Sequence, residues 1–171
     1  MASSGDDLSL SQTPLQQLNQ LIAKVFDEES INLELNDWAI VDLLRQVCAE
    51  ECIQLVSSVT TAQGNDSLLH RAAIANNMVL INTIIEQLSL DQWFQLLMSF
   101  ADKSPIHVAA AAGQPDAINA MLGPLSAQQT QEVISLFDLN GRQALDLVPE
   151  HAPAVRTMLW RAWRDSLQSK R

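Results

Sequence analysis

The chain has 171 residues, of which 47% are apolar, so it is long and hydrophobic enough to bury the core of one domain. It contains five glycines and no tyrosine, and leucine, alanine and glutamine are abundant, which favours helices over strands. The formal net charge of -10 argues against nucleic-acid binding as the main role, because phosphates require a basic surface.

Charge is distributed unevenly along the chain. Residues 1–60 carry ten acidic and two basic side chains, a net charge of -8. Residues 151–171 carry five basic side chains and one acidic side chain, a net charge of +4. The basic end either contacts an acidic partner or a membrane surface, or it places favourable charge at the C-terminus of a last helix.

The two cysteines, Cys48 and Cys52, lie one helical turn apart, a spacing that disfavours a disulfide. The N-terminus lacks the apolar region of a secretory signal peptide, and no apolar run reaches the ~18 residues that span a bilayer. We therefore expect no transmembrane segment and a cytoplasmic location, where thiols stay reduced. Delivery into a host cell by a specialised secretion machine stays open.

The N-terminal part predicts a cap of helices. Residues 1–12 are polar, and we expect them to form a flexible N-terminus. Thr13 and Pro14 then begin a helix with one apolar face, and residues 13–35 are expected to be a helical cap. A second helix is expected to begin near Asp37.

The middle of the chain repeats itself. Residues 104–125 match residues 67–88 at an offset of 37, and His107 then meets His70. In both copies a serine stands three positions before the histidine, and a pair of alanines follows it. A repeat of this length indicates stacked structural units, each of which cannot bury its apolar face alone.

Two further copies are weaker. One opens at residues 140–147, with Asp146 in the place of the histidine, 39 residues on. The other lies upstream at an offset of 29, where it aligns Cys52 with Ile81 and lacks the histidine.

Each unit predicts a short alanine-rich helix, a tight turn, and a second helix with an apolar stripe. The first helices are expected at residues 67–75, 104–112 and 143–149. Ser89 and Ser126 have the pattern of N-caps, so a third short helix is expected after each second helix. The third helices are expected at residues 90–98 and 127–136, and a longer final helix at residues 153–168.

The phrases at residues 104–110 (SPIHVAA) and 140–147 (NGRQALDL) resemble the ankyrin repeat. The resemblance covers about residues 60–168, and more weakly residues 36–60. It departs from the family in its unit length, since family repeats have about 33 residues, and in a short helix where the family has a β-hairpin. Elongated, divergent units of this kind are similar to the ankyrin domains of effector proteins from intracellular bacterial pathogens.

The resemblance implies an all-α fold: an ankyrin-type helical repeat solenoid with an N-terminal helical cap and a long C-terminal helix. The ankyrin-repeat domain would occupy residues 36–171. Its units would be a degenerate repeat at residues 36–60 and repeats at about residues 61–100, 101–138 and 139–171.

In the ankyrin family the histidine of the repeat is structural, and its imidazole bonds to backbone and to the hydroxyl at the start of the phrase. The resemblance implies this role for His70 and His107, with Asp146 at the same position in the last unit. A catalytic alternative would combine Cys48 or Cys52 with His70 and Asp146. The histidines are expected to lie about 10 Å apart along the stack, which is too far for a triad.

We therefore predict that the protein is not an enzyme and has no cofactor. Cys52 is expected to be an inert buried side chain, because its alignment with Ile81 places it on an apolar stripe. The histidines and cysteines show no zinc-ligand spacing, and no glycine-rich phosphate loop is present. A cryptic cysteine-based site around Cys48 is the alternative from another class.

In the ankyrin family, partners bind a concave groove lined by the turn before the first helix and by the end of that helix. The resemblance implies binding of a protein partner there, and the acidic composition favours a partner with a basic surface. The positions are Asp66, Ile74, Asn76 and Asn77 in one unit, Lys103, Ala112 and Gln114 in the next, and Arg142 and His151 in the last.

Tryptophans are candidates for core positions or for partner binding. Trp38 is expected in the core and Trp93 at a half-exposed position. Trp160, on the last helix beside several arginines, either anchors a partner or covers the end of the core. We expect a monomer, with a homodimer through the terminal helix, or a self-associating scaffold, as the alternative.

Overall fold

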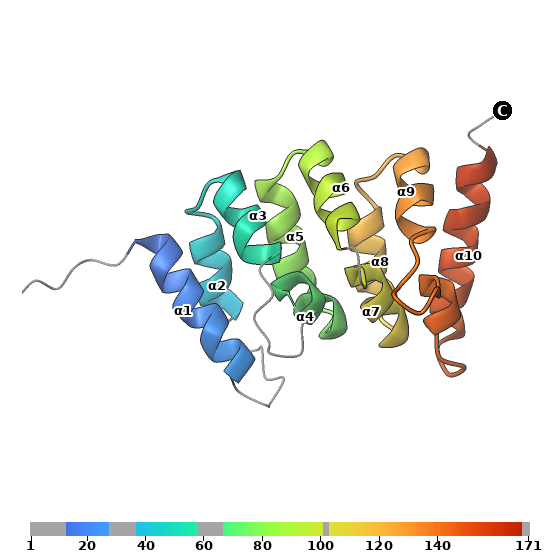
Figure 1. The fold of residues 1–171 in the computed structure, drawn as a ribbon, viewed down its shortest axis with the longest axis horizontal. Coiled ribbons are helices and arrows are strands. Elements are labelled where there is room, and N and C mark those ends of the chain that lie inside the picture. The colour runs from blue at the N-terminus through green and yellow to red at the C-terminus, as the bar shows by residue number, and fades with distance from the viewer. Residues whose placement is uncertain (1–12, 28–36, 58–66, 101–102, 169–171) are drawn as a thin grey trace, which may run out of the picture.

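The computed structural model describes residues 13–27, 37–57, 67–100 and 103–168, so the predicted flexible N-terminus and Asp66 lie outside the described residues. Within these ranges every regular element is a helix, which confirms the predicted all-α class. The helices lie side by side in a row that runs from α1 to α10 (Figure 1). The first three are α1 (Pro14–Asp27), α2 (Asp37–Leu44) and α3 (Ala49–Ser57).

Three lines of helices run along this row. In the first line α4 packs on α7, and α7 packs on the 3-10 helix η1. In the second line α2 packs on α5, α5 on α8, and α8 on α10, while in the third line α6 packs on α9 and α9 on α10. The bounds are α4 Leu68–Ile74, α5 Met78–Gln87, α6 Leu90–Ser99, α7 Pro105–Ala111, α8 Pro115–Leu122, α9 Ala127–Ile134, η1 Ala144–Leu147 and α10 Pro153–Gln168.

The turn between the first and second helix has the same geometry in both units. Asn76 has a φ of 55°, and Gly113, which stands 37 residues later, has a φ of 72°. Asparagine and glycine are the residues that adopt this left-handed conformation most readily. A Cβ atom at Gly113 would also lie 3.1 Å from the Cβ atom of Ala152, so this turn packs closely against the next unit.

The third helices begin with reciprocal caps, as the sequence predicted. The Ser89 hydroxyl accepts a hydrogen bond from the Gln92 N–H at 3.3 Å, and the Gln92 side chain accepts one from the Ser89 N–H at 2.9 Å. Ser126 and Gln129 repeat this arrangement with distances of 3.3 Å and 3.0 Å. Because each cap satisfies otherwise unpaired N–H groups, it determines where the helix starts.

The N-terminal helices align differently from the sequence prediction. The offset of 29 placed α2 with α4, but α2 packs on α5 and so belongs to the second line. At the start of α3 the Cys48 N–H donates to the Glu51 carboxylate at 3.1 Å, and at α6 and α9 the serine N–H donates to the side-chain oxygen of the glutamine three residues on. Cys52 therefore corresponds to Trp93 instead of Ile81. A helical apolar stripe fits several registers, and the cap and the packing select one.

The last unit departs from its predicted helix over residues 143–149. Only the four residues of η1 are helical, and they form a 3-10 turn. Pro149 lacks a backbone N–H and disfavours helical geometry at the residue before it, so the turn cannot extend. Asp146 accepts a hydrogen bond from the Gln143 N–H at 2.9 Å and so caps its own turn.

Two tryptophans occupy positions opposite to those expected. Trp93 is fully buried, and its indole N–H donates to the carbonyl oxygen of Met121 at 3.0 Å, which ties α6 to the end of α8. Trp38, expected in the core, is 65% exposed near the start of α2. The sequence placed both tryptophans on expected helices, but only packing determines which helix face is covered.

Truncating these two tryptophans should have very different effects. We expect Trp93→Ala to lower the free energy of unfolding by about 3–5 kcal/mol, because it opens a cavity in the core. Trp38→Ala should change the same quantity by only about 0.5 kcal/mol, since the side chain is exposed. Urea unfolding followed by circular dichroism measures both, and similar losses would contradict the assignment of Trp93 to the core.

Candidate functional site

His70 links its own unit to the next one. Its Nδ1 atom lies 2.8 Å from the Ser67 hydroxyl and accepts from the Ser67 N–H at 3.3 Å. Its Nε2 atom lies 2.6 Å from the carbonyl oxygen of Lys103. A carbonyl oxygen only accepts, so Nε2 carries the hydrogen and Nδ1 accepts from serine. The ring also meets Phe100 edge to face, with centroids 4.8 Å apart.

His107 makes the same pair of bonds one unit later. Its Nδ1 atom lies 2.7 Å from the Ser104 hydroxyl, and its Nε2 atom lies 3.2 Å from the carbonyl oxygen of Arg142. Burial lowers the pKa of His107, although the bond to the Arg142 carbonyl opposes this shift. Both imidazoles are buried and bonded at both nitrogens, so neither is available as a base.

The two cysteines differ in exposure. Cys52 is fully buried, and burial raises the pKa of its thiol to about 11, with nearby Cys48 adding to the shift. At neutral pH this thiol is protonated and is a poor nucleophile. Cys48 is exposed at the start of α3. Among the described residues, no three His, Cys, Asp or Glu side chains gather as a group that could hold a metal ion.

Several predicted partner-binding residues make hydrogen bonds between units. The Asn76 side-chain oxygen accepts from the Ala117 N–H at 2.9 Å, which caps the start of α8. The Gln114 side chain donates to the carbonyl oxygen of Ile74 at 3.2 Å, from one turn to the preceding one. These hydrogen bonds hold successive turns together, so both side chains already make contacts within the protein.

Asn77 and Arg142 are likewise engaged within the protein. The Asn77 side chain accepts from the Leu80 N–H at 3.0 Å and caps α5. Arg142 pairs with Asp138 at 2.9 Å. Hydrogen bonds from the Arg142 N–H, and also from its guanidinium and the Asn140 N–H, hold the pKa of Asp138 at about 2. This network fixes the loop that accepts the His107 bond.

The remaining predicted positions leave a short exposed edge. Ala112 and His151 are exposed, and Lys103 is half-buried with its carbonyl bonded to His70. Ile74 is half-buried and packs against the core. We define the turn edge as Ile74, Ala112 and His151, and partner binding there stays a prediction.

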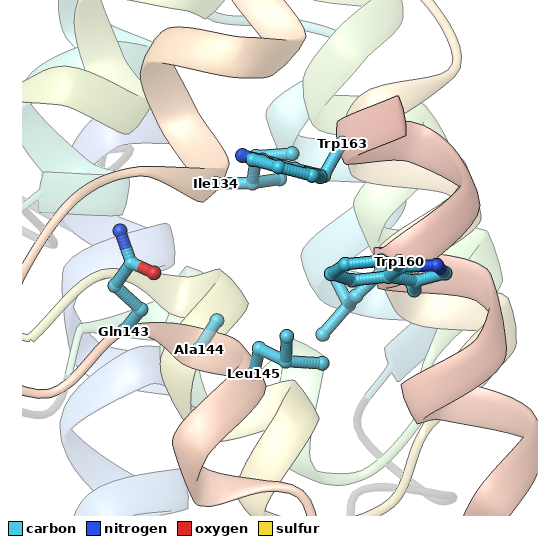
Figure 2. A pocket seen from close by; sticks show the side chains of 7 residues that line it. Ile134, Gln143, Ala144, Leu145, Trp160 and Trp163 are labelled. Atoms are coloured by element: carbon cyan, nitrogen blue, oxygen red, sulfur yellow. The ribbon is translucent and has the colours of Figure 1, made fainter. Parts of the chain in front are cut away.

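Trp160 lies at a cavity that the sequence did not predict. Trp160 and Trp163 stack with ring centroids 5.1 Å apart and ring planes inclined by 25°. Their indoles form one wall of a cavity of about 290 Å³ between α9, η1 and α10, and Gln143 and Ala144 lie across it (Figure 2). The lining side chains are Ile134, Gln143, Ala144, Leu145, Leu159, Trp160 and Trp163, which we call the tryptophan pocket.

One feature of the sequence points to this pocket: two tryptophans, Trp160 and Trp163, stand three residues apart on the expected last helix. No pattern in the sequence points to the rest of the lining, which comes from the end of α9, from Gln143 and from η1. Ile134 and Leu145 have the pattern of ordinary core residues, and only the close approach of three separate elements makes them part of one cavity.

No protein-family model, curated protein or solved structure matches this chain. None of the described helices has both the length and the apolar character that a membrane crossing requires. The interpretation of the site therefore rests on the contacts and exposures given above.

The buried His107 should make stability depend on pH. Its pKa in the folded state lies below 6.5, so the unfolded chain binds a proton first as the pH falls. The stabilisation that results from this difference in the pKa of His107 is fully present above about pH 6.5. It is lost as the pH falls toward the pKa of the folded state. Replacing His107 with glutamine should therefore reduce the loss of unfolding free energy between about pH 7.5 and pH 5.5.

Urea unfolding at each pH measures this effect. His151→Gln is the matched control, because His151 is exposed, and it should leave the pH dependence as in the wild type. An unchanged slope in His107→Gln would contradict the assigned shift.

Thiol labelling should separate the two cysteines. We expect a disulfide reagent at neutral pH to modify only Cys48 in the native protein, and to modify Cys52 only after denaturation. Cys48→Ser should then abolish labelling of the native chain while leaving one reactive thiol in urea. Labelling of Cys48 that is faster in the native chain than in urea, or native labelling of Cys52, would instead favour a reactive cysteine site.

Proposed function

We propose that this chain is a non-enzymatic protein interaction module built from ankyrin-type repeats. The observation that carries the proposal is the repetition of one bond: an imidazole capped by serine donates to a carbonyl of the next unit, at His70 and again at His107. A buried, neutral imidazole that joins two loops serves rigidity. A rigid row of units offers a preformed surface, which lowers the entropic penalty of binding a partner.

The partner would dock on the turn edge. Ala112 and His151 are exposed there, while Asn76 and Gln114 hold the backbone beneath them in place. The net charge of -10 favours a partner with a basic surface, whose association would slow as salt rises. Such a module acts by occupancy: it recruits, blocks or shields the protein that it holds.

A cysteine-based enzyme is the less favoured function. The raised pKa of Cys52 and the bonding of both buried histidines argue against a nucleophile with an activating base. Two free cysteines fit a reducing compartment, and we propose a cytoplasmic location on that ground.

One substitution at the turn edge tests the proposal. We expect Ala112→Arg to weaken capture of the partner from lysate at least tenfold, which is about 1.4 kcal/mol, because a bulky cation replaces an exposed small residue. The control is Gln95→Arg, which adds the same charge at an exposed position of α6. Binding is measured by quantitative affinity capture with each variant immobilised, after thermal unfolding shows that both fold.

Asn76 and Gln114 are left intact in this test, because their loss would disturb the stacking of the units. Equal recovery by Ala112→Arg and Gln95→Arg would remove the turn edge as the binding surface. A partner that binds the wild type equally well at low and high salt would contradict the expected basic surface.

A further inference from the structure

We propose that the tryptophan pocket is a second binding site, which takes one apolar anchor side chain from an acidic segment of a partner protein. The site lies at the C-terminal end of the row, between α9, η1 and α10. It does not depend on the turn edge, so the two surfaces can be tested separately.

The shape of the pocket fits a single inserted side chain. Its volume of about 290 Å³ is at the lower end of the range for small-molecule sites. Five of its seven lining side chains are large and apolar, and the other two are Gln143 and the small Ala144. Trp160 is 53% exposed and Trp163 is 38% exposed, so both indoles have area left for a partner to cover. Tryptophans that line a pocket are frequent anchors in protein interfaces.

Exposed apolar side chains concentrate around this end of the molecule. Of the eight large hydrophobic residues exposed in the described part of the chain, five fall between Phe137 and Leu167. Phe137 and Leu139 lie on the loop that joins the pocket residues Ile134 and Gln143, while Trp160, Trp163 and Leu167 lie on α10. Trp160 and Trp163 stack on each other, and contiguous exposed apolar area is typical of an interaction surface.

Charge indicates what kind of segment would bind. Arg156 and Arg164 stand four residues before and after Trp160, so they lie on the same face of α10, and both are exposed. The helix carries three arginines against Asp165, a net charge of +2 in a chain whose total is -10. No ionisable side chain lines the pocket itself. Acidic residues beside an apolar anchor would therefore complement this surface.

Local charges decide the interaction, because the field of the distant acidic region is screened beyond about 8 Å at physiological salt. Three acidic groups lie within two residues of the pocket lining, and each has an ion-pair or hydrogen-bond partner within the protein. Asp165 pairs with Arg164 at 3.1 Å, Asp146 accepts the Gln143 N–H at 2.9 Å, and Glu132 accepts from the Gln128 side chain at 3.1 Å. Arg156 donates to the carbonyl oxygen of Val148 at 3.0 Å, which fixes its position while it keeps its charge.

The pocket wall is held in place before any partner arrives. Gln143 follows Arg142, whose carbonyl oxygen accepts from His107 and from the Asp138 N–H, the latter at 2.8 Å. The Gln143 side chain also donates to the carbonyl oxygen of Ser135 at 3.4 Å. A preformed wall lowers the ordering that binding would otherwise require.

Selection of peptides tests the proposal without knowledge of the natural partner. A phage-displayed library of random linear peptides is selected on the full chain and counter-selected on Trp160→Ala. We expect enriched peptides in which Leu, Met, Phe or Trp stands beside Asp or Glu. No enrichment over the counter-selection, or enrichment of peptides with Lys or Arg beside the anchor, would overturn the proposal.

An enriched peptide is then synthesised with a fluorescent label, and its affinity is measured by anisotropy. We expect at least a tenfold loss with Trp160→Ala, with Trp163→Ala and with Arg164→Glu, and weaker binding at high salt. Trp38→Ala, which removes an exposed tryptophan elsewhere, should leave the affinity unchanged. Equal affinities for Trp160→Ala and Trp38→Ala would overturn the pocket as the site.

Two further measurements separate this site from other possibilities. Ala112→Arg should bind the peptide as the wild type does, so a failure of the turn edge leaves the pocket standing. Sedimentation at micromolar concentration tests the other occupant, a second copy of this chain. If the wild type associates and Trp160→Ala does not, the pocket belongs to self-association and the acidic partner is ruled out.

Discussion

The structure depends on a hydrogen bond that runs from a buried imidazole in one unit to a backbone carbonyl in the next. A single unit leaves its apolar face exposed and its loop carbonyls without partners. Stacking of a second unit buries the face and supplies hydrogen-bond donors for the carbonyls. His70 and His107 provide the link because a neutral imidazole can accept from a serine on one side and donate on the other. In the last unit Asp146 occupies this position, and it caps its own turn.

Because the buried histidines and Cys52 serve the fold, we place the proposed functions on exposed surfaces. The buried histidines and Cys52 contribute to the core, so chemistry at these residues would disturb the fold. Two of the accessible surfaces in the described part of the chain are candidates for binding. The turn edge belongs to a strongly acidic chain, whereas the tryptophan pocket lies on a basic helix. As proposals, these two surfaces suit partners of opposite charge.

Local rules and packing contribute differently to this fold. The caps at Ser89 and Ser126 were predictable, because a serine followed three residues later by glutamine satisfies the same N–H groups in any helix. Trp93 and Trp38 were both misplaced, because each could face either way on its helix. The alignment of α2 failed for a similar reason: a stripe of apolar residues fits several partners, and only its contact with α5 decides.

By itself the sequence determined the helical class, the positions of most helices, and the equivalence of His70 and His107. These follow from short-range patterns of capping, turn residues and apolar spacing, which act within one or two turns of helix. Only the tertiary structure decided that Asn76 and Gln114 hold the turns together, and that Trp160 and Trp163 line one cavity with residues of α9 and η1. Such features depend on the distance between separate elements, which no local pattern encodes.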